Sequence, residues 1–526
     1  MCQKPILFLF ASLLLSACTR SAGNSAAWTP AAPVPLVLPA ISPIQTYLPP
    51  TRAPGSPLLT PTPNNNPPGF SPTLAFAAPQ NSAEPTSGPN TYIVQDGDYL
   101  GAIADSYGIT LEELAAANNL DPNAAVIYPG DTLVIPSASA VAPLSANGQA
   151  TSDYFKIIPD SELFYGPLAT LLNVETYVQQ KSGYLAYYTQ DVDGATLTGA
   201  QIVQRVAENY SVNPRLLLAV LEYRSQWVSN PNPAPSTLYT PVGYVDDYRV
   251  GLYHQLSWTA DRLNEGFYRW REGKISTWQL ADDSMIAPQP GINPGTASLQ
   301  NLFADLDDQA TWQFDTGPNG LYATYNAMFG YPFDFAIEPI LPPGLTQPAL
   351  ILPFAKGETW AFTGGPHGGW DTGSAWAALD FAPPGDPIGC GASDAWTTAV
   401  ADGTILSAKN GRVVQDLDND GLEQTGWTIL YMHMESRDRV QAGTFVRAGE
   451  HIGHPSCEGG YAEADHLHLA RRYNGMWISA TAPGLIFTLE GWQVSGGNNE
   501  YDGFLNRNAQ SVEAWGIVTP LNQIQR

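Results

Sequence analysis

The stretch DHLHLA, residues 465–470, places two histidines two positions apart in a run that is otherwise largely apolar. Side chains at positions i and i+2 of a β-strand point to the same face. The stretch therefore predicts a strand that projects His466 and His468 side by side into a cleft, while Leu467 and Leu469 pack behind them. Six of the seven histidines of the chain lie between positions 367 and 468. Because histidine is the commonest metal ligand in proteins and titrates near neutral pH, this clustering indicates a site.

Two other segments contain complementary ligand types. GGPH ends at His367, and ALDFAPPGD contains Asp380. A catalytic zinc ion takes three protein ligands of the His, Asp or Glu type and leaves a fourth position for water. His367, Asp380 and His468 form such a set, and His466 would lie beside the water. The segment GWTILYMHM is predicted to be a strand that brings His433 to the site from the other side.

Residues 350–480 resemble the zinc metallopeptidases that include lysostaphin and the β-lytic endopeptidases. The resemblance rests on the His…Asp pair, the histidine in YMHM, the segment V-x-A-G-x-x-I-G at positions 446–453 and the closing H-L-H. In lysostaphin-type members the first histidine lies four positions before the aspartate, where this chain has Trp376. The spacing of 13 between His367 and Asp380 is similar to that of the β-lytic branch, which has an insertion there.

The resemblance implies one zinc ion, held by His367, Asp380 and His468, and two catalytic histidines, His433 and His466. Short strands with turn signals between them predict an antiparallel β-sheet domain over residues 346–526. A metal-free copy of the same fold is the alternative. The chain has no HExxH motif, so His433 and His466 are expected to take over the proton transfer that the glutamate of that motif performs elsewhere.

The N-terminus predicts export. Residues 1–17 contain one lysine, an apolar run and small residues ahead of Cys18, which is typical of a signal peptide rather than of a membrane span. The sequence LSAC, which ends at Cys18, resembles a bacterial lipoprotein cleavage box. The resemblance implies that Cys18 becomes the lipidated first residue and that the lipid anchor is the contact with the membrane. An ordinary signal peptide of a secreted protein is the alternative.

After such a cleavage Cys2 is gone and Cys18 is occupied, so Cys390 and Cys457 remain as a pair. In an oxidising compartment a disulfide between them is expected. It would connect the segment that follows Asp380 to the segment that precedes His466. Two buried free thiols are the alternative.

The composition is strongly acidic, with 49 Asp and Glu against 23 Lys and Arg and a net charge of −26. This balance argues against nucleic acid as a partner and against electrostatic binding to anionic lipid. The 46 prolines exceed what one globular domain holds and indicate linkers. Residues 18–90 are rich in Pro, Ser, Ala, Thr and Asn and almost free of charge, so we predict a disordered tether there.

Residues 91–137 predict a small α+β module. An alternating strand at TYIV is followed by a turn at Asp-Gly, two helical patterns and a second strand at TLVI. This βααβ order resembles the LysM module, which binds glycans that contain N-acetylglucosamine. The resemblance implies a glycan-binding groove near Gly97, Asp98, Leu100, Leu120 and Ile127.

Residues 153–345 are aromatic-rich and predicted to be mostly helical, with one helix beginning at Asn213-Pro214. The segment resembles the lysozyme-like fold of lytic transglycosylases. Where that family has its catalytic glutamate followed by serine, this chain has Arg224-Ser225, and arginine cannot donate the required proton. Glu222 lies about 200° away around the helix. We therefore predict a non-catalytic module that holds glycan or acts as a spacer; an active glycosidase that uses Glu222 is the alternative.

The segment DLDNDG, residues 416–421, begins as calcium-binding loops do, with Asp416, Asp418 and Asp420 alternating ahead of a glycine. An EF-hand requires glutamate at the twelfth loop position, which is Trp427 here. We therefore expect a hairpin tip at these three aspartates; a bound calcium ion, which would stiffen the strand of His433, is the alternative.

Together these features predict a multidomain bacterial envelope enzyme. A LysM module, a helical module and a β-sheet metallopeptidase domain would act as a peptidoglycan hydrolase that cuts peptide cross-links, anchored by lipid outside the cytoplasm. The glycan would bind to the LysM module and the peptide to the zinc site. One alternative is a non-catalytic envelope protein that binds cell-wall peptide or activates another hydrolase, and another is a secreted general protease.

Overall fold

The computed structural model describes residues 90–94, 100, 103–104, 111–120, 127–128, 130–136, 155–289, 291–385 and 389–526. All of these residues belong to one unit of the chain, residues 85–526. The predicted signal peptide, Cys18 and the predicted tether up to residue 89 lie outside the described residues. So do Gly97 and Asp98 of the predicted glycan groove.

The N-terminal part of this unit has both predicted strands, and they pair with each other. Strand β1 (Asn90–Ile93) pairs antiparallel with β2 (Thr132–Ile135), and helix α2 (Leu111–Ala117) precedes β2. The Asn118 side chain connects helix to strand, because it donates to Val134 O at 2.8 Å and accepts from Val134 N at 2.7 Å. Leu120 and Ile127 lie partly buried at the edge of a small core formed by Val94, Leu100, Ile103, Ala104, Leu114, Leu133 and Ile135.

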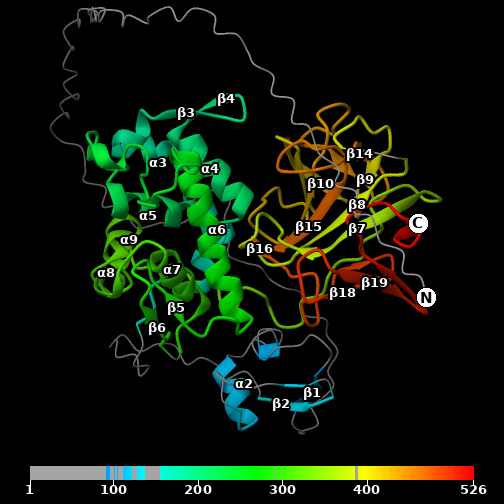
Figure 1. Cartoon of the computed structure of the whole chain (residues 1–526), viewed down its shortest axis with the longest axis horizontal. Coiled ribbons are helices and arrows are strands. Elements are labelled where there is room, and N and C mark those ends of the chain that lie inside the picture. Colours follow the sequence, from blue (N-terminus) through cyan, green and yellow to red (C-terminus); the bar gives the residue numbers. More distant parts are fainter. Residues whose placement is uncertain are drawn as a thin grey trace, which may run out of the picture. The chain divides into compact units, whose positions relative to one another are not determined.

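Residues 155–345 form the predicted helical body (Figure 1). Its α-helices are α3 (Val174–Lys181), α4 (Gly199–Tyr210), α5 (Pro214–Ser225), α6 (Leu252–Arg271), α7 (Pro294–Ala304), α8 (Gln309–Asp315) and α9 (Leu321–Phe329). Its short strands are β3 (Thr189–Val192), β4 (Ala195–Thr198), β5 (Trp278–Gln279) and β6 (Met285–Ile286). Single 3-10 turns occur at η1 (Asp160–Glu162), η2 (Pro167–Leu171), η3 (Tyr184–Ala186) and η4 (Pro235–Thr237).

Local sequence explains where α5 begins. Pro214 occupies the first helical position, and the Asn213 side chain accepts a hydrogen bond from Arg215 N at 3.0 Å. An asparagine cap followed by proline is a favoured start, because neither residue leaves a backbone N–H without a partner. The predicted start of this helix is confirmed. One face of α6 is apolar, and its residues are fully buried: Leu256, Ala260, Leu263 and Phe267.

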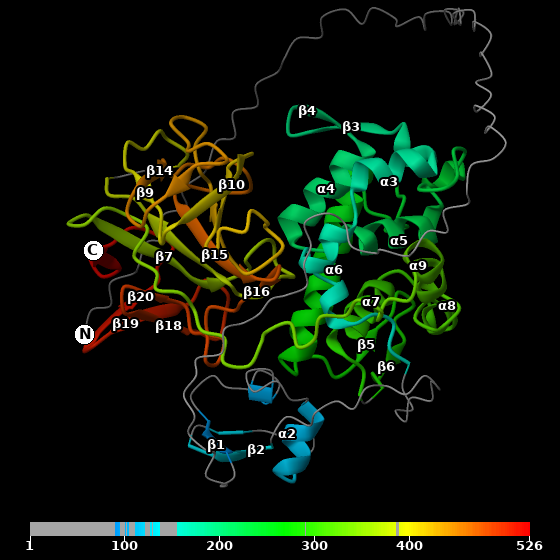
Figure 2. The ribbon, with the colours of Figure 1, turned by 180° about the vertical axis from the view of Figure 1, so that it is seen from behind.

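The C-terminal part is an antiparallel sheet with the strand order β13-β10-β11-β12-β15-β8-β7-β21, in which β16 also pairs with β15. A separate four-stranded sheet has the order β17-β18-β19-β20, and its strands β18 to β20 are visible in Figure 2. The strands are β7 (Thr359–His367), β8 (Ala378–Ala382), β9 (Thr397–Thr398), β10 (Gly403–Lys409), β11 (Arg412–Asp416), β12 (Trp427–Met432), β13 (Phe445–Val446), β14 (His451–Gly453), β15 (Leu467–Tyr473), β16 (Met476–Trp477), β17 (Thr488–Leu489), β18 (Trp492–Gly496), β19 (Gly503–Arg507), β20 (Gln510–Glu513) and β21 (Gln523–Gln525).

The two faces of the main sheet bury different cores. One core is formed within the β-rich part, with inward residues that alternate along their strands, such as Leu467 and Leu469. The other core is shared with the helical body, and its sheet residues include Ala378, Leu430 and Ala470. The sheet is therefore covered on one face by the helical body, which explains why its strands β8, β11 and β12 are buried at every position.

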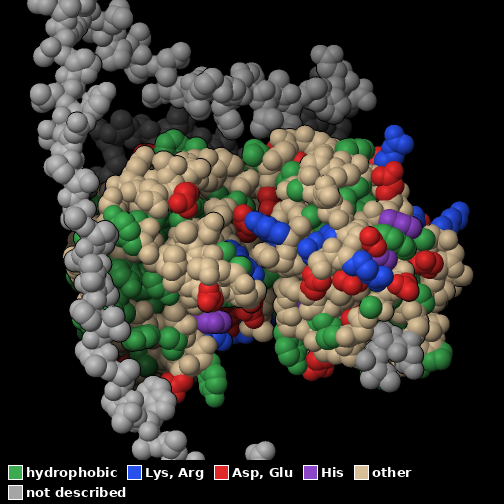
Figure 3. All heavy atoms as spheres, turned by 90° about the horizontal axis from the view of Figure 1, so that it is seen from above, with side chains coloured by type: hydrophobic (Ala, Val, Ile, Leu, Met, Phe, Trp, Pro, Cys, Tyr) green, Lys and Arg blue, Asp and Glu red, His purple; other side chains and the backbone are tan. Residues whose placement is uncertain are grey.

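The surface carries many charged side chains, and the described helices are short or polar. On the face shown in Figure 3, acidic side chains are scattered among polar and apolar ones, with lysine and arginine side chains beside several of them. Among the helices of the described residues, none is both long and apolar enough to cross a membrane.

Candidate metal centre

The strand register brings two of the predicted ligands together. In the pairing of β15 with its two neighbours, His468 lies opposite Asp380 of β8 on one side and opposite Met432 of β12 on the other. Paired residues of neighbouring antiparallel strands point to the same face of the sheet. Asp380 and His468 therefore project side by side, and the predicted placement of Leu467 and Leu469 behind them is confirmed, since both are fully buried.

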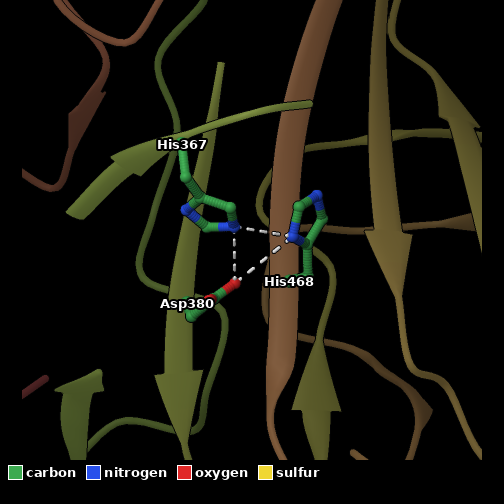
Figure 4. Close-up of side chains that lie close together, drawn as sticks. All are labelled: His367, Asp380 and His468. Atoms are coloured by element: carbon green, nitrogen blue, oxygen red, sulfur yellow. Dashed lines mark hydrogen bonds and ion pairs between the residues drawn. The ribbon is translucent and has the colours of Figure 1, made fainter. Parts of the chain in front are cut away.

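His367 reaches the same place by an irregular path. It ends β7, and the register of β7 against β8 shifts twice before it, between Phe362 and Gly364 and between Gly364 and His367. Such shifts bend a strand and redirect its side chains. Figure 4 shows the outcome, in which the rings of His367 and His468 and the Asp380 carboxylate point toward one common space.

The three donor atoms lie at similar separations. His367 Nε2 is 3.0 Å from His468 Nδ1, and each of these nitrogens is 3.3 Å from Asp380 Oδ1. Ligand atoms at the corners of a zinc tetrahedron, each about 2.0–2.1 Å from the ion, lie about 3.3 Å apart. The three side chains therefore have the spacing of three zinc ligands.

Backbone carbonyls fix which nitrogen of each ring is free. His367 Nδ1 donates to Gly365 O at 2.8 Å, and His468 Nε2 donates to Gly369 O at 3.1 Å. A carbonyl oxygen only accepts, so these nitrogens carry the hydrogen of a neutral ring and the opposite nitrogens present lone pairs. The lone pairs of His367 Nε2 and His468 Nδ1 then face each other and the Asp380 carboxylate.

This arrangement fits a cation. Asp380 Oδ1 is buried and has no hydrogen-bond partner among the described residues. A buried anionic oxygen without a partner is strongly unfavourable, and so are lone pairs that face one another. A divalent ion at the common point would satisfy all three donors at once. Two imidazoles and one carboxylate are a donor set that zinc accepts, and they leave one position open.

Burial and the mutual contacts of the three ligands together determine their pKa values. Burial raises the pKa of Asp380, but the neighbouring His367 and His466 outweigh this effect and hold the pKa well below its usual value. Burial lowers the pKa of His367, but Asp380 outweighs it and the net pKa is raised. Burial lowers the pKa of His468. The carboxylate is therefore ionised throughout the physiological pH range, as a metal ligand must be.

The two predicted catalytic histidines lie beside this set. His466 Nε2 is 3.9 Å from Asp380 Oδ1, and the rings of His433 and His466 have centroids 4.5 Å apart. His433 Nδ1 donates to Glu458 O at 3.1 Å and His466 Nδ1 donates to Ala464 O at 2.9 Å. Each ring therefore has its Nε2 available as a proton acceptor.

His433 does not lie in a strand, so the prediction that its strand continues through residue 434 is wrong. Strand β12 ends at Met432, and His433 has a left-handed backbone with φ of 63°. This turn aims the imidazole at His466. Burial, followed by repulsion from His466 and His468, lowers the pKa of His433 to about 3, so its ring is neutral near pH 7.

The predicted disulfide is present. Cys390 and Cys457 are joined with their Cα atoms 5.6 Å apart. Cys390 follows the segment of Asp380, and Cys457 belongs to the turn in which Ser456 pairs with His466. The bond therefore connects the two loops on either side of the metal centre, as expected from the cysteine positions.

The site opens into a cleft of about 1430 Å³. Its walls come from both folded parts. The helical body contributes Arg205, Tyr210 and Tyr253, and the β-rich part contributes the loop at residues 458–466 and the pair Glu500 and Tyr501. A substrate in this cleft would contact the helical body as well as the metal centre.

Sequence reasoning missed Glu500 and Tyr501. Gly368 N donates to Glu500 Oε1 at 3.1 Å, and the Tyr501 ring stacks on His367 with centroids 4.2 Å apart. Both residues lie in the loop between β18 and β19, where the segment NNEYDG has the composition of an ordinary turn. No local signal connects that turn to His367, because the contact depends on how the small sheet packs.

The residues weighed for glycan cleavage have structural partners. Glu222 accepts hydrogen bonds from Val228 N and Ser229 N, both at 3.1 Å. Arg224 forms ion pairs with Asp307 at 3.0 Å and Asp315 at 3.1 Å. Glu222 thus holds the turn after α5, and Arg224 neutralises two buried acids.

The three aspartates of DLDNDG gather at the predicted hairpin tip between β11 and β12. Asp416 is buried, and its carboxylate accepts from Asp418 N, Asn419 N and Gly421 N at 3.0–3.1 Å. Backbone donors thus satisfy this carboxylate within the turn. A calcium ion at Asp416, Asp418 and Asp420 stays the alternative to the hairpin tip.

Three family models match separate regions of the chain. The model of Peptidase family M23 matches residues 391–480, which include His433, His466 and His468. The LysM domain matches residues 92–136, and the model described as LasA, N-terminal domain matches residues 156–341. The C-terminal region is thus similar to zinc metallopeptidases. The helical body matches the N-terminal domain of LasA, and its lysozyme-like character stays a prediction.

Several solved structures are similar to part of this chain. A deep-sea M23 metalloprotease, pseudoalterin, is 23% identical and aligns over 32% of this chain and 96% of its own, with a TM-score of 0.27. The catalytic domain of lysostaphin from Staphylococcus simulans is 27% identical over 24% of this chain and 90% of its own, with a TM-score of 0.18. A zinc-containing peptidase from Vibrio cholerae is 21% identical over 26% of this chain and 40% of its own, with a TM-score of 0.19. Among curated proteins, none matches this chain.

Proposed function

We propose that this chain is a zinc-dependent endopeptidase that hydrolyses peptide cross-links of bacterial peptidoglycan. The observation that carries the proposal is the convergence of His367 Nε2, His468 Nδ1 and Asp380 Oδ1 within 3.3 Å of one another. The match of residues 391–480 to Peptidase family M23 supports the reaction class, and the match of residues 92–136 to the LysM domain supports the cell wall as substrate.

The proposed chemistry assigns distinct tasks to five side chains. His367, Asp380 and His468 hold the zinc ion. A bound zinc ion supplies Lewis-acid polarisation of the scissile carbonyl and activation of the attacking water. His433 is neutral near pH 7, so its free Nε2 would accept a proton from the attacking water. His466 presents its own Nε2 on the same side. When that nitrogen carries a hydrogen, it and the protonated His433 would donate to the negative charge that develops on the carbonyl oxygen.

The other parts of the chain would bring this site to its substrate. We propose that the LysM region binds glycan around Leu100, Leu120 and Ile127, together with Gly97 and Asp98. We further propose that Cys18 carries a lipid that holds the enzyme at the outer side of the cytoplasmic membrane, with residues 18–90 as a tether. Radiolabelled palmitate incorporation into wild type but not into Cys18→Ser would test the anchor.

Mass analysis of the fragments released from purified peptidoglycan tests the reaction. The zinc-loaded chain is expected to release fragments with new amino termini, and removal of zinc by a chelator should stop the release. Casein serves as the control substrate for a general protease. If peptidoglycan stays intact while zinc binds stoichiometrically, the chain is a binding protein and the proposal is wrong.

A further inference from the structure

The loop that follows His367 touches both the metal centre and the helical body. We propose that the helical body is a positioning element of the metal centre: through Tyr210 and Asp261 it holds the loop of residues 368–374, and this loop keeps His468 oriented for the metal. The inference deepens the proposed function and rests on the zinc site assigned there.

The register of the sheet brings the helical body close to the ligands. Asp380 and His468 are paired across neighbouring strands. Two residues further along the same strands, Ala470 is paired with Ala378 on one side and with Leu430 on the other. Two residues of a strand span about 7 Å. Ala378, Ala470 and Leu430 belong to the core shared with the helical body, and the two alanines leave room for close approach. The helical body thus packs on the sheet directly beside the paired residues that include Asp380 and His468.

Two hydrogen bonds and one ring contact attach the loop to the helical body. The Tyr210 hydroxyl at the end of α4 donates to Asp371 Oδ2 at 3.0 Å, and Gly373 N donates to Asp261 Oδ1 of α6 at 2.7 Å. The rings of Tyr210 and Trp370 meet edge to face with centroids 6.3 Å apart. Gly373 is required for this approach, because a Cβ atom there would lie 2.1 Å from Asp261 O.

The same loop is bonded to His468. Gly369 O accepts the hydrogen bond from His468 Nε2 at 3.1 Å. A ligand histidine depends on such a partner, because the bond fixes both the ring orientation and the nitrogen that faces the metal. Gly369 therefore determines that Nδ1, rather than Nε2, is the metal-facing atom of His468.

The position of Gly369 depends on the helical body a second time. A Cβ atom on Gly369 would come within 2.6 Å of the Trp477 ring, so the glycine lies directly against that ring. Trp477 Nε1 donates to Tyr210 O at 3.3 Å, and Trp477 N donates to the Tyr268 hydroxyl of α6 at 2.9 Å. Helices α4 and α6 thus hold the loop on one side and the tryptophan beneath it on the other.

The experiment compares two tyrosine hydroxyls of the helical body in the full chain. Tyr210→Phe removes the bond to the loop but keeps the ring against Trp370. Tyr223→Phe is the matched control, because its hydroxyl donates to Asp315 Oδ1 at 2.5 Å inside the helical body. Zinc dissociation constants are measured by competition with a chromophoric chelator, and the cobalt-substituted proteins are compared by their visible absorption.

Tyr210→Phe is expected to weaken zinc binding about threefold to tenfold, since loss of an outer partner of a ligand typically weakens metal binding by about tenfold to a hundredfold and Tyr210 acts one step further away. Its cobalt spectrum should shift. Tyr223→Phe should match wild type in zinc affinity and in its cobalt spectrum, although each of the two substitutions lowers the melting temperature. Zinc binding of Tyr210→Phe within twofold of wild type would overturn the inference.

Asp371→Ala tests the same bond from the loop, where the Asp371 side chain is exposed and its removal opens no core. It should weaken zinc binding at least as much as Tyr210→Phe does, because it also removes the bond from Thr372 N to Asp371 Oδ1. The double variant should bind zinc no more weakly than the worse single variant, because both changes remove the Tyr210–Asp371 hydrogen bond. Fully additive effects would count against the inference. Failure of the wild-type chain to bind zinc would instead overturn the proposed function.

Discussion

Tyr501 stacks on His367, with ring centroids 4.2 Å apart and ring planes 18° apart. Around this contact, Gly365 N donates to Tyr501 O at 2.8 Å and Tyr501 N donates to Pro366 O at 3.1 Å. The small sheet β17–β20 thus supports the strand that delivers the first metal ligand. A stacked aromatic pair contributes about 0.5–1.5 kcal/mol beyond its buried area.

Tyr501→Ala should therefore weaken zinc binding and lower the rate of peptidoglycan hydrolysis, each by about threefold to tenfold. Tyr501→Phe keeps the ring and should retain near-normal values, because the contact that matters is between ring faces. Chelator competition and turbidity loss of peptidoglycan suspensions give the two readouts. An equal loss in the Phe and Ala variants would mean that the hydroxyl, not the stacking, is important.

The metal ligands and the catalytic histidines should separate in a metal analysis. Asp380→Ala and His468→Ala each remove a donor atom and are expected to leave little bound zinc. His433→Ala and His466→Ala leave all three donors in place and should keep close to one zinc ion per chain. Their hydrolysis rate should still fall roughly a hundredfold or more, because His433→Ala removes the proton acceptor and His466→Ala removes a donor to the developing negative charge. Elemental analysis after gel filtration measures the bound zinc, and the peptidoglycan assay on the same samples measures the hydrolysis rate.

Full hydrolysis by the His466→Ala protein would remove that residue from the mechanism. Loss of zinc from the same variant would instead make His466 a fourth ligand. The 3.9 Å separation of its Nε2 from Asp380 Oδ1 makes the catalytic role the expected one.

The placement of His466 and His468 could be predicted from sequence, because alternation of side chains between two faces is a property of any β-strand. The two-residue repeat in HLHLA determines that His466 and His468 share a face and that Leu467 lies behind them. The left-handed turn at His433 could not be predicted in this way. Met434 beyond it is fully buried, so the apolar alternation continues past the residue at which the strand ends.

Contacts between distant segments could not be predicted either. Tyr210 and Gly369 are more than a hundred residues apart in the chain, and neither belongs to a motif. The helical periodicity predicts that Tyr210 lies on the inner face of its helix, but the partner on that face depends on how a sheet packs against it. Long-range packing follows from shape and burial summed over many residues, which a single sequence segment does not contain.

The raised pKa of the Asp261 carboxyl predicts that the stability of the protein depends on pH. Burial, followed by the nearby Asp371, raises the pKa of Asp261 to about 7 from its ordinary value of 3.8. A carboxyl with a raised folded-state pKa contributes stability that is fully present below pH 3.8 and is lost as the pH rises through about 7. The amide of an Asp261→Asn protein stays neutral and can still accept from Gly373 N.

Asp261→Asn should therefore gain stability relative to wild type as the pH rises from about 5 to about 8, by about 1–2 kcal/mol after allowance for the partial exposure of the side chain. Thermal melting of both proteins at several pH values measures this gain as a few degrees. A difference in melting temperature that is constant with pH would show that Asp261 is ionised throughout.

Glu222 provides the test of whether the helical body cleaves glycan. Its carboxylate is engaged by Val228 N, Ser229 N and the Ser229 hydroxyl, and a general acid needs a proton to give rather than three donors to accept. Glu222→Gln retains an acceptor for the backbone and should leave the sugar products of peptidoglycan digestion unchanged. Arg224→Ala should instead lower stability by about 3–5 kcal/mol, because it leaves Asp307 and Asp315 buried without their cation. Anhydro-sugars that appear with wild type and disappear with Glu222→Gln would assign a second, glycan-cleaving activity to this body.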